Sequence, residues 1–194
     1  MDVFDHFIIK DGRKEVKRWG LIFTCLASRA IHLETLNALT TDSFIIALRR
    51  FVSRRGKVRE LRSDQGTNFI GARNEQLAEL KELNRKSINQ FLSLQDCDWI
   101  MFNLNVPHAS QMGGILESQI RTTRSVLPSL LREHGSQLDN ESLRTLKTEA
   151  ENIVKSRSLT VDNLTDPLAA EPLTPNHILI QKTQVELPPP GKFD

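Results

Sequence analysis

The first third of the sequence places one helical pattern between two strand patterns. Residues 30–36 and 58–64 each alternate between apolar and polar side chains, as half-exposed strands do. Between them, Thr40 or Thr41 can cap a helix that Gly56 ends. A strand that follows such a helix after a short turn usually returns to the same sheet. The sequence therefore predicts an α/β fold.

The remaining patterns extend this arrangement. Further strands are expected at 1–9, 19–26 and 99–102, and further helices at 72–84, 87–94, 115–134 and 139–157, with a loop over 107–114. Beyond Leu159 the periodicity fades, and six of the eight prolines follow residue 166. We therefore expect one domain over 1–160 and an extended, proline-containing tail over 161–194.

Composition excludes some classes of protein. The 194 residues are 39% hydrophobic and 26% charged, and no apolar run approaches the roughly 20 residues that span a bilayer. The first residues lack the pattern of a signal peptide, so we expect a nuclear or cytoplasmic location, with no secretion and no membrane partner. The net charge of +2 is not diagnostic.

Basic residues are nevertheless concentrated in one stretch. Its members are Arg49, Arg50, Arg54, Arg55, Lys57, Arg59 and Arg62. The stretch is either a surface that faces a polyanion or an ordinary solvated helix face.

Three carboxylates are candidates for chemistry. Asp64 ends the strand pattern of 58–64, directly before a turn at Gly66. By itself it is readily explained as a turn or capping residue. Asp2 lies inside the first strand pattern, where an unpaired carboxylate would cost several kcal/mol. Glu117 lies one turn into the helix expected after the two glycines at 113–114.

If these three acids lie close together, their negative charges repel one another unless bound cations balance them. Hard oxygen ligands are those that Mg²⁺ and Mn²⁺ prefer. Two such ions about 4 Å apart can clamp the attacking and leaving oxygens of a phosphodiester displacement. The chemistry indicated is phosphoryl transfer on nucleic acid.

Two arginines share the helix face of Glu117. At 3.6 residues per turn, Arg121 and Arg124 lie on that face and are available to hold DNA phosphates. The simpler alternative is an i,i+4 ion pair between Glu117 and Arg121, which is worth a few tenths of a kcal/mol.

Six stretches of the sequence carry a family resemblance. They are KRWGLIFTCLASRAIHLE, TDSFIIALRRFVSRRG, RSDQGTNFIGA, MGGILESQIRTTR, KSRSLT and EPLTPNH, in this order over nearly the whole chain. With them the chain resembles the integrase catalytic core of retroelements, most closely that of Pao/BEL-type LTR retrotransposons in the DDE superfamily.

The resemblance implies a ribonuclease H-like fold with a five-stranded mixed sheet flanked by helices. It also implies a catalytic triad of Asp2, Asp64 and Glu117 that binds two Mg²⁺ or Mn²⁺ ions. Such enzymes trim a DNA 3′ end and join it to target DNA, so the implied partners are element ends and target DNA, with a homo-oligomer as the working form. The residues expected to contact DNA are Asn68, Gln111, Arg121 and Arg124.

Two other functions stay open. A retrotransposon-derived fragment can survive as a domesticated module that binds nucleic acid or protein without catalysis. The sequence begins one residue before Asp2 and carries Pro128 inside an expected helix, at a cost of about 3 kcal/mol. Its five histidines show no metal-ligand spacing that would replace the zinc-binding domain of complete integrases.

The second alternative is a ribonuclease H. Such an enzyme would need a fourth acid, and Glu149 and Glu151 fit no such motif.

Overall fold

The computed structural model describes residues 1–64, 84–102, 107–134, 138–159 and 172–180. Within these ranges, the side chains of 64, 100–102, 107–113, 133–134 and 180 fall outside the description. The strands are β1 (Asp2–Asp11), β2 (Lys14–Thr24), β3 (Ile31–Leu36), β4 (Glu60–Asp64) and β5 (Asp98–Phe102). The helices are α1 (Thr41–Arg55), α3 (Arg85–Ser93), α4 (Pro107–His134), α5 (Asn140–Lys155) and α6 (Pro175–Ile180).

The five strands form two sheets rather than the single one expected. β1, β2 and β3 make an antiparallel sheet in that order, and β4 pairs with β5 in parallel. The hydrogen bond that the structure describes between them runs from the α-amino group of Met1 to the carbonyl oxygen of Arg62, at 2.6 Å. The start of β1 thus touches β4 without forming a ladder with it.

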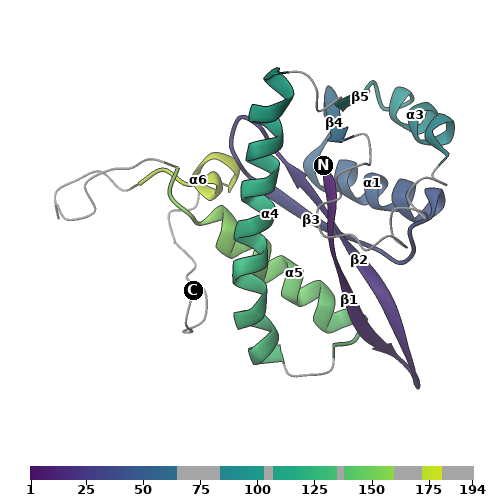
Figure 1. The fold of residues 1–194 in the computed structure, drawn as a ribbon, viewed down its shortest axis with the longest axis vertical. Coiled ribbons are helices and arrows are strands. Elements are labelled where there is room, and N and C mark those ends of the chain that lie inside the picture. The colour runs from purple at the N-terminus through teal and green to yellow at the C-terminus, as the bar shows by residue number, and fades with distance from the viewer. Residues whose placement is uncertain (65–83, 103–106, 135–137, 160–171, 181–194) are drawn as a thin grey trace.

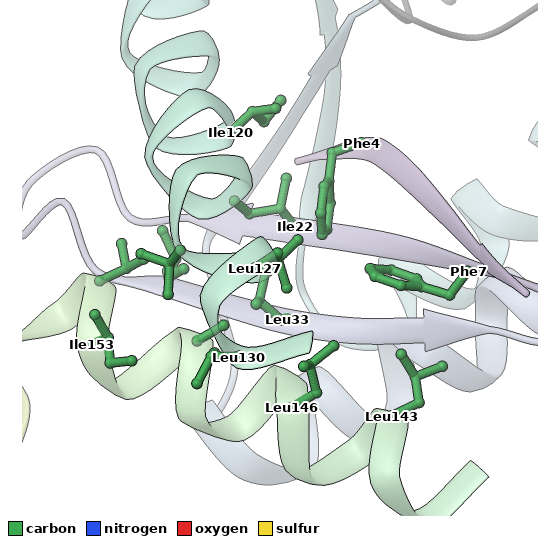
Figure 2. Packing of buried hydrophobic residues seen from close by; sticks show 14 of the residues in the cluster. Phe4, Phe7, Ile22, Leu33, Ile120, Leu127, Leu130, Leu143, Leu146 and Ile153 are labelled. Carbon is green, nitrogen blue, oxygen red and sulfur yellow. The ribbon is translucent and has the colours of Figure 1, made fainter. Parts of the chain in front are cut away.

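Two hydrophobic cores cover the two faces of the antiparallel sheet. On one face, Ile22 and Leu33 pack against α4 and α5, as Figure 2 shows. On the other face, Leu21 and Phe23 pack against α1 and α3. Leu61 of β4 belongs to this second core, so hydrophobic packing joins the two sheets where a ladder does not.

A β-bulge interrupts the pairing of β1 with β2. Val3 lies opposite Leu21 and Asp5 opposite Gly20, so Phe4 is the extra residue on β1. Phe4 is 4% exposed, and its ring covers Gly20 so closely that a Cβ built there would lie 2.5 Å from the ring. Glycine at position 20 therefore lets the bulge pack into the core (Figure 2).

Replacing Gly20 with alanine should lower the free energy of unfolding by about 1 to 2 kcal/mol. The methyl group would displace the Phe4 ring at about 1 to 3 kcal/mol, against a gain of roughly 0.5 to 1 kcal/mol from a less flexible unfolded chain. Gly114 is the control, because a Cβ there would meet nothing within 4 Å. In urea denaturation Gly114→Ala should stabilise the protein, and equal effects of the two substitutions would contradict the packing argument.

Two segments differ from the sequence expectation. Residues 107–114 were expected as a loop but form the first two turns of α4. Pro128 lies inside this helix, with its ring exposed, and the helix continues to His134. The expected extended tail is wrong for 175–180, which form α6. Asn176 is buried there and donates hydrogen bonds to Asn152 and Ser156. Among the described helices, none is long and apolar enough to cross a membrane.

Candidate active site and its surroundings

One hydrogen bond links the chain segments that carry two of the predicted acids. Asp2 directly follows Met1, whose amino group bonds the carbonyl oxygen of Arg62, and Asp64 lies two residues beyond Arg62 as the last residue of β4. The indole of Trp99 donates to the hydroxyl of Ser63 at 2.9 Å, which fixes the end of β4 against β5. The side chain of Asp2 is half-buried, and that of Asp64 lies outside the described residues.

The third predicted acid lies on an exposed face of α4. Glu117 is 56% exposed and forms an ion pair with Arg121, which is 78% exposed, at 3.2 Å. The simpler alternative from the sequence, an i,i+4 pair, is thus confirmed. In this geometry Arg121 balances the charge of Glu117, and both side chains reach solvent, so such a pair adds little to stability.

Arg124 makes contacts that the sequence did not indicate. Its guanidinium donates a hydrogen bond to the carbonyl oxygen of Phe4, the bulged residue of β1. Its Nε also lies 3.5 Å from a carboxylate oxygen of Asp5. The arginine therefore links α4 to β1 in the structure, while a DNA contact by Arg124 stays a prediction.

The other predicted DNA contacts cannot be placed. Asn68 lies outside the described residues, and of Gln111 the structure describes the helical backbone in α4 and not the side chain.

Five members of the basic stretch have acidic partners, namely Arg50, Arg54, Arg55, Lys57 and Arg62. Arg49 and Arg59 are exposed. This pairing favours an ordinary charged surface over a broad polyanion-facing patch.

The proposed metal ligands fit a divalent ion by their chemistry. Aspartate and glutamate supply the hard oxygen donors that Mg²⁺ takes. Among the described side chains, no group of three His, Cys, Asp or Glu residues could hold a metal ion. The side chain of Asp64 lies outside the described residues, so the triad stays a prediction. The observation in its favour is the hydrogen bond from Met1 to Arg62, which links the segment of Asp2 to the strand that ends at Asp64.

A buried ionic cluster lies where α1 and α5 meet β3. His32 and Glu34 of β3 are 4% and 3% exposed, and Glu151 of α5 is 8% exposed. Nε2 of His32 lies 3.0 Å from Glu34, and Nδ1 lies 3.2 Å from Glu151. Arg50 pairs with Glu34 at 2.6 Å, and Lys155 pairs with Glu151 at 2.7 Å. We call these five residues the ionic cluster.

Two members of the ionic cluster also bond the backbone of β3. Glu151 accepts a hydrogen bond from the amide of Leu33 at 3.0 Å, and Arg50 donates one to the carbonyl oxygen of Thr35 at 2.6 Å. In the part of the chain that the structure describes, β3 is the last strand of its sheet, and no further strand there bonds these groups. Arg55 of α1 joins the same arrangement through an ion pair with Glu151.

The surroundings shift the pKa values in the ionic cluster. Burial alone would raise the pKa of Glu34, but hydrogen bonds from His32 and Arg50 outweigh it and lower this pKa to about 2. For Glu151, burial is likewise outweighed by His32 and Lys155, and its pKa is also about 2. Burial opposes a charge on His32, yet hydrogen bonds to both carboxylates raise its pKa. The two carboxylates thus favour the protonated form of His32.

Only part of this cluster could be predicted from the sequence. Alternation predicts that His32 and Glu34 lie on one face of a strand. Glu151 lies 117 residues further along the chain than Glu34, which no local pattern could connect. The signal in the sequence is a histidine and a glutamate in a strand whose other residues are mostly apolar.

Two solved structures resemble this chain. The HTLV-2 integrase catalytic core domain in complex with magnesium, in a trimeric form, superposes with a TM-score of 0.55 at 16% identity, over 92% of this chain and 92% of that chain. A chain of the simian T-cell lymphotropic virus intasome, in complex with PP2A regulatory subunit B56 gamma, superposes with a TM-score of 0.54 at 13% identity. That match covers 98% of this chain and 56% of the other, so the present chain spans little more than half of its length.

These likenesses concern the fold. The chain has the fold of a retroviral integrase catalytic core, and at such low identity the similarity shows no more than that. No family model matches the sequence. No curated protein matches it either.

Proposed function

We propose that the chain is the catalytic core of a retroelement integrase of the Pao/BEL type, a polynucleotidyl transferase that processes DNA 3′ ends and joins them to target DNA. The observation that supports the proposal is the hydrogen bond from Met1 to Arg62, which links the segment of Asp2 to the strand that ends at Asp64 in an integrase-like fold. Element ends and target DNA are the proposed substrates, and a homo-oligomer is the proposed working form.

Each residue of the proposed site has a role. Asp2, Asp64 and Glu117 would hold two Mg²⁺ ions, which, when bound, supply Lewis-acid activation of the attacking and leaving oxygens. Arg121 is exposed beside Glu117, so its guanidinium is placed to exchange the carboxylate for a DNA phosphate. Asn68 and Gln111 are further proposed contacts with DNA. Positioning of the DNA and stabilisation of developing charge would then account for the catalysis.

Asp64→Asn should reduce nicking of supercoiled plasmid DNA in the presence of Mn²⁺ at least about 100-fold, which corresponds to about 2.7 kcal/mol in the barrier. The amide keeps the shape of the side chain and removes the negative charge that holds a cation. Asp98→Asn is the matched control, because Asp98 is an exposed aspartate at the opposite end of the same parallel pair of strands. That variant should keep its activity within about twofold, since its carboxylate lies far from the proposed ligands.

The opposite result would favour a different class of protein. If wild type and Asp64→Asn are equally inactive, the enzymatic proposal fails. DNA binding that persists in Asp64→Asn and weakens steeply with salt would then identify a nucleic-acid-binding module.

A further inference from the structure

The bulge in β1 creates a backbone group that the sheet does not satisfy. Phe4 is the extra residue between the pairs Val3–Leu21 and Asp5–Gly20, and a bulged residue is left out of the ladder. A buried carbonyl without a partner costs about 1 to 3 kcal/mol. Here the guanidinium of Arg124 supplies the partner. One side chain from α4 thus completes the hydrogen bonding of β1 two residues after Asp2.

The same arginine is in register with Glu117. Seven residues separate the two, which is close to two full helical turns, so both side chains project from one face of α4. A contact made by Arg124 therefore fixes both the rotation of the helix and its position along its own axis. The same contact therefore fixes the position of Glu117 around and along the helix axis, because both residues belong to one rigid helix.

Asp2 and Glu117 both lie on the N-terminal side of this contact, each within its own strand or helix. Figure 1 shows β1 and α4 running from the top toward the bottom of the view. Asp2 precedes Phe4 by about 7 Å of strand, and Glu117 precedes Arg124 by about 10 Å of helix. The contact between Arg124 and Phe4 therefore fixes the position of the Asp2 backbone relative to that of Glu117.

We propose that Arg124 is a positioning residue that sets the distance between Asp2 and Glu117 by gripping the bulge at Phe4. The inference rests on the proposed function, since it assigns to that site the contact that holds two of its ligands in register. Asp5 assists, because its carboxylate lies 3.5 Å from Nε of Arg124 and restricts the guanidinium. The tight fit of Phe4 over Gly20 keeps the bulge itself in place.

Binding of Mn²⁺ to the DNA-free protein tests the proposal without reference to activity. Arg124→Ala should weaken Asp64-dependent Mn²⁺ binding about fivefold to tenfold, about 1 to 1.4 kcal/mol. Simple electrostatics predicts the opposite, because loss of a positive charge near a cation site strengthens cation binding. Arg124→Lys, which keeps a donor for Phe4 but loses the planar group that also meets Asp5, should restore only part of the affinity. If Arg124→Ala binds Mn²⁺ as tightly as wild type, the proposal is overturned.

Arg121→Ala is the matched control on the same helix face. It removes an equal charge one turn from Glu117 without touching β1, so its affinity for Mn²⁺ should be unchanged or higher. A loss equal to that of Arg124→Ala would show a general effect of arginine removal and overturn the proposal. If Arg124→Ala does not fold, Arg124→Gln replaces it in the same comparison.

Amide hydrogen exchange separates failure of this proposal from failure of the proposed function. If wild type shows no Asp64-dependent Mn²⁺ binding, the proposed function fails. Amide hydrogen exchange then tests the contact between Arg124 and Phe4 by itself. Arg124→Ala should then speed exchange in residues 2–5 and 115–123 at least about fivefold more than Arg121→Ala does, since only the former opens the contact. Equal exchange in the two variants would refute the positioning role.

Discussion

Replacing Glu151 with alanine should lower the free energy of unfolding by about 3 to 5 kcal/mol, the range seen when one partner of a buried ion pair is removed. The carboxylate meets His32, Arg55 and Lys155 and also accepts the amide of Leu33. Alanine would remove one of the two carboxylates that contact His32 and would leave the amide of Leu33 without its partner. Equilibrium denaturation in urea, followed by circular dichroism, measures the loss.

Glu141→Ala provides the comparison on the same helix. Glu141 is exposed in the first turn of α5, where its interaction with the helix dipole is worth about 0.3 to 1 kcal/mol. A Glu151→Ala protein no less stable than Glu141→Ala would show that the ionic cluster contributes nothing net. Glu151→Gln should fall between the two, because the amide keeps an acceptor for Leu33 but loses the charge that His32 requires.

Acidification should destabilise the protein by several kcal/mol between pH 4.5 and pH 2. Glu34 and Glu151 both have a pKa near 2 in the folded chain, below their ordinary value of 4.5. Their stabilisation is therefore fully present above pH 4.5 and is lost as the pH falls toward 2. One pKa unit corresponds to about 1.4 kcal/mol, so the coupled pair should account for on the order of 5 kcal/mol.

His32 has the opposite dependence on pH. Its pKa is raised above the ordinary value of 6.5, so its contribution is complete below pH 6.5 and declines as the pH rises through the folded value. The ionic cluster should thus be most stabilising between about pH 4.5 and pH 6.5. Free energies of unfolding measured across this range check both limbs. His32→Gln should flatten the alkaline limb, and an unchanged slope in Glu151→Gln below pH 4.5 would contradict the assignment of the acid limb.

The order of the elements could be predicted from the sequence because local patterns decide it. Period-two and period-3.6 patterns, with Thr40 as cap and Gly56 as stop, located α1 and the strands on either side of it. The start of α4 could not be predicted, because two consecutive glycines favour a loop. There the helix continues through Gly114, which faces open space. Tertiary hydrogen bonds from Asn176 likewise order α6 in a segment whose composition suggests an extended tail.

In the candidate site, too, only the contacts that local spacing decides could be predicted from the sequence. The pairing of Glu117 with Arg121 followed from helical spacing alone. The contact of Arg124 with Phe4 did not, because a β-bulge depends on how β1 pairs with β2 and leaves no signature in either strand. The prediction of one five-stranded sheet failed for a related reason. Strand patterns show that strands exist, whereas the ladder between β1 and β4 depends on backbone register.

The ionic cluster also decides how β3 meets other molecules. An edge strand with unsatisfied amides and carbonyls is a template for strand addition by another chain, and many proteins block such edges with charge. Here Glu151 occupies the amide of Leu33 and Arg50 occupies the carbonyl of Thr35. A second polypeptide could extend this sheet only after displacing both side chains, and the acid that protonates Glu151 would remove one of the two barriers. At neutral pH, copies of this chain that come together at this edge must therefore meet through side chains rather than through a sheet shared between molecules.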